Sequence, residues 1–239
     1  MNWTLVYILA AVLLLPAFIY GGLSQIMATS TFERYSKIAA HSGITANELT
    51  KKLLEISGIE GVDVIKIDGR LTDCYDPRHK VVKLSTATYD SASVSALGVC
   101  AHEVGHAIQD AKGSFLFRLR IALVPVINFM SKLFLPLILL GSILSFALYI
   151  ESIGYYITLA SVVLYGASML FYMITLPLEY DASKRALQIL RETGTLTGSE
   201  LDSAKKVLKA AIQTYVAELI VSILYFLRFL SYAALFNKD

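Results

Sequence analysis

Residues 133–178 read LFLPLILLGSILSFALYIESIGYYITLASVVLYGASMLFYMITLPL, and Glu151 is the only charged residue among them. A helix that crosses a membrane needs about 20 mostly apolar residues. The runs on the two sides of Glu151 each come close to or exceed that length, so they predict two spans joined by a turn at Glu151. We therefore expect the chain to be built around an apolar helical hairpin.

Two further stretches are apolar enough to cross a membrane. No Asp, Glu, Lys or Arg occurs in residues 1–32, and a span is expected from Trp3 to about Gly22. This segment lacks a basic start, and its apolar run exceeds the roughly 7–15 residues of a signal-peptide core, which favours an uncleaved anchor over a cleaved signal peptide. The fourth candidate, residues 210–236, is interrupted by Glu218 and Arg228.

The composition excludes several classes of protein. Of the 239 residues, 56% are hydrophobic and 17% are charged, whereas a soluble domain carries about 25% charged residues. Disorder is excluded by the amount of apolar surface, and a secreted disulfide scaffold is excluded because the chain has only 2 cysteines. The net charge of +2 is too small to indicate a basic surface that binds nucleic acid, so the expected partner is the lipid bilayer.

The positions of the basic residues predict the orientation in the membrane. Thirteen Lys and Arg residues lie between residues 34 and 132, six lie between 184 and 209, and none precedes residue 34. Basic residues gather in the cytoplasmic loops of membrane proteins. We therefore expect a multi-pass protein of the cell membrane, with its N-terminus outside and segments 28–120 and 179–209 in the cytoplasm.

The polar segment 28–117 is predicted to be a small α+β unit. Its signals are a capping box at Thr45 to Glu48 and two runs rich in β-branched residues. The expected elements are a helix over 31–40 with Thr31 as its N-cap, a helix from 46 that ends at Gly58, strands over 62–67 and 81–85, and a helix over 91–110 that breaks near Lys112 and Gly113.

The motif that carries chemistry is His102-Glu103-Val104-Gly105-His106. On a helix, residues i and i+4 differ by about 40° in azimuth and about 6 Å in rise, so both imidazoles can hold one Zn²⁺. Glu103 lies beside that position and can take a proton from a water that the metal activates. A chance match on a buried helix is the plain alternative. Two histidines on one stripe, out of 4 in the chain, count against it.

A catalytic zinc has three protein ligands and one open position. Glu179 is favoured as the third ligand because it is the first charged residue after the third span, and two crossings return it to the side of His102. The alternative is a solvated residue at the end of a span. Asp181 suits a supporting role that orients a ligand histidine. The full set of candidates is His41, His79, Asp110, Glu179 and Asp181.

Three segments resemble the bacterial YugP-type membrane zinc metallopeptidases. They are AHEVGHAIQ at 101–109, DCYDPR at 73–78 and LPLEYDAS at 176–183. More distantly, the chain is similar to the HtpX and CAAX-prenyl-protease group of gluzincins, in which E-[FY]-x-A-D follows the returning span and its Glu is the third zinc ligand. The chain matches that pattern at Glu179, Tyr180 and Ala182, and it departs at Ser183, where the group has Asp. The resemblance supports Glu179 as a ligand and leaves the supporting residues open.

The expected fold is a mainly α integral membrane protein, with about four transmembrane helices and a small α+β cytoplasmic zinc-peptidase subdomain. We divide it into five segments by apolar pattern and motif. These are a transmembrane anchor at 1–27, the α+β subdomain with the HExxH helix at 28–117, a transmembrane hairpin at 118–178, cytoplasmic helices with the third zinc ligand at 179–209, and a fourth apolar helix at 210–236.

The expected function is that of a zinc-dependent integral-membrane metalloendopeptidase acting on a peptide or protein. One catalytic Zn²⁺ is held by His102, His106 and Glu179, and Glu103 is the general acid and base. The rival is a non-catalytic membrane scaffold or sensor whose structural zinc is closed by a fourth ligand such as His79. The donor that assists the oxyanion stays open among Tyr180, Arg185, His79 and Arg78.

Two expectations concern residues 74–85. An extended peptide substrate would pair with strand 81–85 if that strand lies at an edge, and an ordinary core strand is the equal alternative. Cys74 and Cys100 are expected to be small core residues that stay reduced in the cytoplasm.

Overall fold

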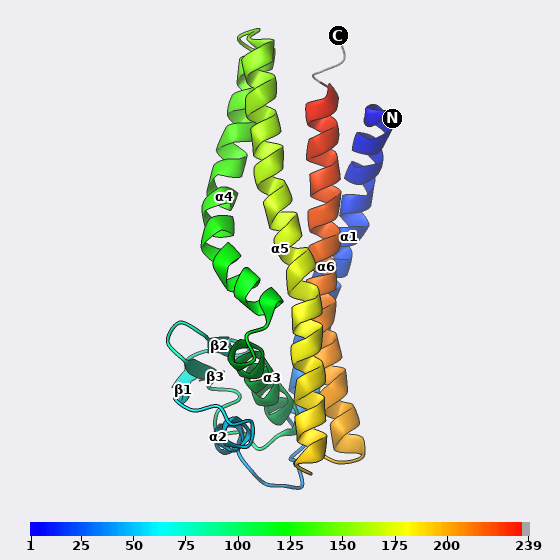
Figure 1. Cartoon of the computed structure of the whole chain (residues 1–239). Helices are drawn as coiled ribbons and strands as arrows, with labels where there is room; N and C mark the ends of the chain where they lie inside the picture. The colour runs from blue at the N-terminus through cyan, green and yellow to red at the C-terminus, as the bar shows by residue number, and fades with distance from the viewer. Residues whose placement is uncertain (236–239) are drawn as a thin grey trace. The chain divides into compact units, whose positions relative to one another are not determined.

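The computed structural model describes residues 1–235 and is mainly helical, with one small sheet (Figure 1). This agrees with the mainly helical part of the expected fold class and with its small β element. The elements in chain order are α1 (Trp3–Tyr35), α2 (Ala46–Ile56), β1 (Asp63–Ile67), β2 (Cys74–Asp76), β3 (Val81–Ser85), α3 (Val94–Ala111), α4 (Phe115–Phe146), α5 (Glu151–Glu192) and α6 (Ser199–Leu235).

Among residues 1–235, the helices α1, α4, α5 and α6 are the four that are long and apolar enough to cross a membrane. Their 33, 32, 42 and 37 residues exceed the roughly 20 that a bilayer requires. The predicted turn of the apolar hairpin is confirmed, because α4 ends at Phe146 and α5 begins at Glu151. Phe236, the last residue of the predicted fourth segment, lies outside the described residues.

The predicted separate helix over 31–40 is wrong, because α1 continues without a break to Tyr35. The hydroxyl groups just before Thr31 bond back within the helix instead of capping a new one. Thr29 donates to the carbonyl of Gln25 at 3.1 Å, and Ser30 donates to that of Met27 at 3.2 Å. Such back-bonding lets Ser and Thr stay in a helix interior.

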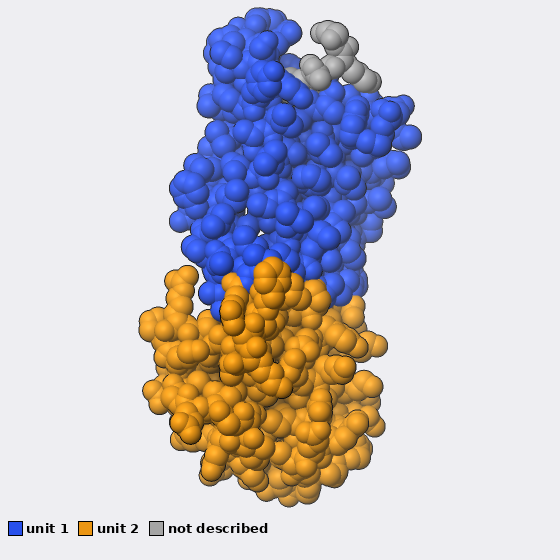
Figure 2. All heavy atoms as spheres, in the orientation of Figure 1, with its two compact units in different colours: residues 1–22, 119–176, 215–239 blue, residues 23–118, 177–214 orange. Residues whose placement is uncertain are grey.

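By its internal contacts the chain divides into two compact units (Figure 2). We call Met1–Gly22, Leu119–Leu176 and Tyr215–Asp239 the helical unit. We call Leu23–Arg118 and Pro177–Thr214 the mixed unit, because it holds the sheet, α2 and α3. The predicted segment boundaries at residues 178 and 209 lie within α5 and α6.

In the helical unit, the two helices of the apolar hairpin touch through glycines. A Cβ atom added to Gly141 would lie 2.8 Å from the carbonyl oxygen of Gly154, and one added to Gly154 would lie 2.6 Å from that of Gly141. Small residues let apolar helices approach this closely and gain dispersion energy. Aromatic rings join α4 to α6, with the centroids of Phe134 and Phe229 4.7 Å apart.

The sheet of the mixed unit has the strand order β1-β3-β2. β3 runs parallel to β1 and antiparallel to β2, so it is the central strand, and Val82 and Leu84 are fully buried. The hypothesis that strand 81–85 lies at an edge is therefore wrong. Lys83 of β3 forms an ion pair with Asp76 of β2 at 2.8 Å.

Helix α3 is the core of the mixed unit, and it contacts α2, β2 and β3. The hydroxyl of Ser93 caps its first turn by accepting from the amide of Ala96. It ends at Ala111, and Gly113 follows with a positive φ of 65°. The predicted helix and its break are confirmed. Thr45 and Glu48 likewise form the predicted capping box of α2.

Gly105 allows α3 to approach α5. A Cβ atom there would lie 2.6 Å from the carbonyl oxygen of Ala182, a distance that real Cβ atoms do not tolerate. We predict that Gly105→Ala pushes the helices apart and lowers the free energy of unfolding by about 1–3 kcal/mol. Thermal melting of the metal-free protein measures this.

The matched control is Gly98→Ala in the same helix. Its Cβ would lie 3.4 Å from the Cβ of Ala204, an ordinary contact, so the better helix propensity of Ala should hold or raise the melting temperature. Equal melting temperatures for the two variants would contradict the close-contact argument.

Candidate metal centre

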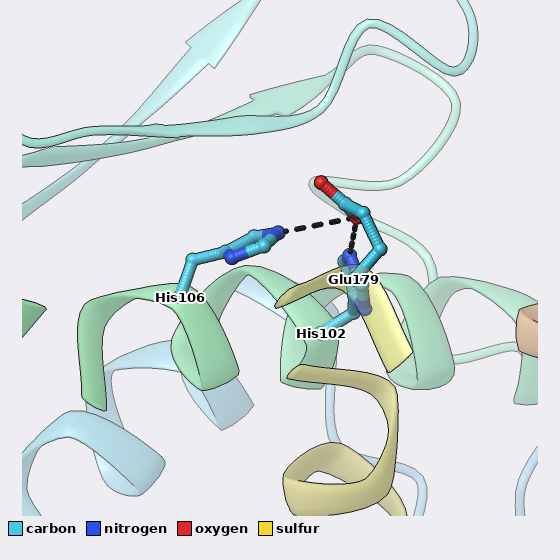
Figure 3. Close-up of side chains that lie close together, drawn as sticks. All are labelled: His102, His106 and Glu179. Carbon is cyan, nitrogen blue, oxygen red and sulfur yellow. Dashed lines mark hydrogen bonds and ion pairs between the residues drawn. The ribbon is translucent and has the colours of Figure 1, made fainter. Parts of the chain in front are cut away.

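Three side chains from α3 and α5 converge within the mixed unit (Figure 3). Nε2 of His102 lies 3.1 Å from Oε2 of Glu179, and Nε2 of His106 lies 3.4 Å from the same oxygen. One ligand atom from each residue lies within 4.8 Å of the other two. The structure thus brings together the three residues that the sequence predicts as metal ligands.

The chemistry of these donors suits zinc. Two imidazole nitrogens and one carboxylate oxygen form a His₂Glu set, which occurs at catalytic zinc sites. Glu179 is 1% exposed and His106 is 6% exposed, so the carboxylate of Glu179 is shielded from solvent. A buried carboxylate is stable only when it is paired or binds a metal. The donor set and its burial therefore fit a zinc ion, and zinc binding by these residues stays a prediction.

The other candidate ligands have different partners. His41 pairs with Glu200 at 2.5 Å, and Nδ1 of His79 lies 2.8 Å from Asp76 with 76% of its side chain exposed. Asp110 accepts from the hydroxyl of Tyr75 at 2.8 Å and from Lys80 at 2.6 Å. Within residues 1–235, the metal cluster contains His102, His106 and Glu179, without the fourth ligand that a structural site requires.

Ser183 of α5 holds the ring of His102. Its Oγ lies 3.1 Å from Nδ1 of that histidine. A hydrogen bond from Nδ1–H leaves the lone pair of Nε2 free for a metal. Ser183 is the position where the more distant gluzincin group has Asp. The chain keeps a hydrogen-bond acceptor there, although an uncharged one.

Gln109 holds the ring of His106 in the same way. Its Oε1 lies 3.0 Å from Nδ1 of His106, three residues earlier on α3. Its Nε2 donates to the carbonyl of Leu178 at 2.9 Å and to the carboxylate of Asp181 at 2.8 Å. Asp181 therefore reaches His106 through Gln109, and Gln109 ties the histidine to α5 beside Glu179.

Glu103 lies beside the cluster and is 7% exposed. Its Oε2 accepts a hydrogen bond of 2.8 Å from the backbone amide of Tyr75 in β2. Burial raises the pKa of Glu103 to about 7, an effect that the charge of His102 opposes and that of Glu179 reinforces. A carboxyl group with a pKa near 7 can both accept and return a proton at neutral pH.

Three residues of the site, Tyr75, Phe117 and Gln109, were not predicted from the sequence. The ring of Tyr75 lies 6.2 Å from that of Phe117, which lies 6.1 Å from the ring of His106, so the two aromatics flank the cluster. Gln109 follows His106 by three residues, a helical spacing that signals a contact. Nothing in the sequence places the backbone of Tyr75 against Glu103.

The proposed oxyanion donors are not drawn together in the described structure. Arg185 donates to Asp181 at 2.7 Å, His79 is held by Asp76, and Tyr180 is 63% exposed. The prediction that both cysteines are core residues is correct for Cys100, which is fully buried, and wrong for Cys74, which is exposed. Cys74 lies in the short edge strand β2, which leaves its thiol accessible.

We predict that Gln109→Ala weakens zinc binding about 10- to 100-fold, because residues that orient ligand histidines have that effect on metal affinity. His102→Ala, which removes a ligand, should abolish stoichiometric binding. Competition with a chromophoric chelator on detergent-purified protein measures both affinities. Gln188→Ala, on an exposed part of α5 where it contacts Glu192, is the matched control. An affinity of Gln109→Ala equal to that of the control would contradict the positioning role.

Along most of its length, the chain is similar to a protein family and to a bacterial protein. The family model described as "Putative neutral zinc metallopeptidase" matches residues 10–234. The "Putative membrane protease YugP" of Bacillus subtilis (strain 168) is 41% identical over 206 residues, which are 86% of this chain and 88% of that protein. No solved structure matches the chain. The chain therefore belongs to the zinc metallopeptidase family that this model describes.

Proposed function

We propose that the protein is an integral-membrane metalloendopeptidase that cleaves a peptide or protein with one zinc ion. The observation that carries the proposal is the convergence of His102, His106 and Glu179, with the buried carboxylate of Glu103 beside them. Membership of a zinc metallopeptidase family supports a protease in general.

The chain's own residues account for the proton movements of hydrolysis. When bound, zinc would supply a Lewis acid that polarises the scissile carbonyl and acidifies a water molecule. Glu103 takes the proton of that water as its oxygen bonds to the carbonyl carbon. The C–N bond then breaks, and Glu103 passes the proton to the leaving amine. The amide of Tyr75 holds the Glu103 carboxylate in place during both transfers.

The supporting contacts orient the two histidine rings. Nδ1–H of His102 and of His106 is directed at an oxygen of Ser183 and of Gln109. With its proton on Nδ1, each ring would present the lone pair of Nε2 to the metal. Glu179 is then the one anionic ligand, so a divalent ion would keep a net positive charge and remain an effective Lewis acid.

The rival scaffold or sensor has less support. It requires a fourth protein ligand, and His79, the candidate for that role, is exposed and paired with Asp76. A structural zinc site also does not require a buried carboxylate such as Glu103 beside it. Measuring both the zinc content and the peptide hydrolysis of the same protein preparation separates the two proposals.

We predict that Glu103→Gln binds one zinc ion and loses hydrolysis by about 10²- to 10⁴-fold, because Gln cannot accept or return the proton. Zinc analysis and peptide cleavage by detergent-purified protein test this, with Glu55→Gln on the exposed side of α2 as the matched control. A Glu103→Gln protein that cleaves peptides at the control rate would refute the mechanism.

We also propose that the protein crosses the cell membrane several times, with the mixed unit in the cytoplasm. The support is the concentration of Lys and Arg in residues 34–132 and 184–209, together with four helices long enough to cross. The relative from Bacillus subtilis is named a membrane protease. The N-terminus would then lie outside, together with the turn between α4 and α5.

The two cysteines allow a direct test of this orientation. We predict that exposed Cys74 reacts with a membrane-impermeant maleimide only after the cells are permeabilised, while buried Cys100 stays unreactive. Tyr149→Cys in a Cys74→Ser background places a thiol in the turn between α4 and α5, at a position 81% exposed. It should react in intact cells. Labelling of Cys74 in intact cells would reverse the orientation.

A further inference from the structure

The helical unit contains a cavity of about 270 Å³. Three helices line it, and α1, α4 and α6 each reach it near one of their ends. Ser142 lies four residues before the end of α4, and Tyr7 lies four residues after the start of α1. The lining residues are Tyr7, Ile138, Ser142, Arg228, Phe229 and Tyr232.

Arg228 is the charged group of this cavity. Its guanidinium lies 5.2 Å from the centre of the Tyr7 ring, and it donates to the hydroxyl of Tyr7 at 3.4 Å. In residues 1–235, neither Asp nor Glu forms an ion pair with Arg228. An arginine in an apolar helix is costly and normally has a partner or faces a water-filled cavity.

The hydrogen bonds leave donors facing the cavity. Ser142 donates to the carbonyl of Ile138 at 2.7 Å, so at 2.9 Å it accepts from the hydroxyl of Tyr232. The hydroxyl of Tyr7 accepts from Arg228, so its own proton is available, and Arg228 uses one of its five N–H groups on Tyr7. The site therefore offers an excess of donors and one positive charge, which selects an anion.

We propose that this cavity binds a phosphate group, supplied by the headgroup of a membrane phospholipid. The planar guanidinium of Arg matches phosphate oxygens in pairs. A cavity of about 270 Å³ has room for a phosphate and part of its headgroup. The acyl chains would lie outside it.

Two observations favour a lipid as the source of the phosphate. Arg228 lies seven residues, about 10 Å, before the end of α6, so the site is near the depth of the headgroups rather than at the middle of a span. Leu139 and Ile143, which neighbour Ser142 on α4, are 54% and 53% exposed and offer apolar surface to acyl chains.

The test uses full-length, delipidated protein in a neutral detergent. Phosphatidylglycerol, diacylglycerol and inorganic phosphate are added separately. Native mass spectrometry counts the bound lipid, and the melting temperature reports stabilisation. We expect phosphatidylglycerol to bind and to raise the melting temperature, and diacylglycerol, which lacks the phosphate, to do neither. Stabilisation by inorganic phosphate alone would keep the anion site and assign it to free phosphate.

The variants assign the effect to this cavity. Arg228→Gln should bind phosphatidylglycerol at least about fivefold more weakly, the equivalent of about 1 kcal/mol for one basic side chain. Lys132→Gln, an exposed residue of α4 outside the cavity, should bind as the wild type does. Tyr7→Phe keeps the charge and loses one hydroxyl, so it should weaken binding less.

Tyr7→Phe also carries the test if Arg228→Gln does not fold. The proposal is overturned if diacylglycerol stabilises the protein as well as phosphatidylglycerol does, or if the folded variants bind phosphatidylglycerol as tightly as Lys132→Gln. Because the cavity lies in the helical unit and the assay needs no zinc, these results are independent of the proposed peptidase activity.

Discussion

The buried carboxylate of Glu179 is the constraint on which the metal centre depends. A carboxylate away from water must be paired or bind a metal, and the imidazoles of His102 and His106 both point at one of its oxygens. This fixes α5 against α3 at the point where Gly105 permits the backbone of Ala182 to come close. A side chain at position 105 would separate the helices and with them the ligands.

Around this contact, a hydrogen bond holds each reactive group in place. Ser183 and Gln109 set the orientation of the two histidines, and Asp181 and the carbonyl of Leu178 hold Gln109. The amide of Tyr75 in β2 holds Glu103. The site thus combines α3, α5 and a three-residue strand, and its precision comes from hydrogen bonds that cross between them.

Much of this arrangement follows from local patterns. The spacing of His102 and His106 on one helix stripe, the position of Glu179 after the third apolar run and the capping box at Thr45 are short-range signals, and the described structure agrees with each. The central place of β3 was not predictable, because its second partner β2 has only three residues next to a turn. The prediction that Thr31 caps a new helix was wrong for a related reason, since a Thr hydroxyl can bond at a helix cap or inside a helix.

By itself the sequence determined the four apolar helices, the helix that carries HExxH and the identity of the three predicted ligands, because hydrophobic runs and helical periodicity are properties of neighbouring residues. Only the tertiary structure decided that Gln109 and Ser183 orient the histidines, that Tyr75 holds Glu103, and that Arg228 faces a cavity beside Tyr7. These contacts join residues from 3 to 221 positions apart. All but the shortest depend on how helices and strands pack, and packing is set by the whole chain rather than by any one segment.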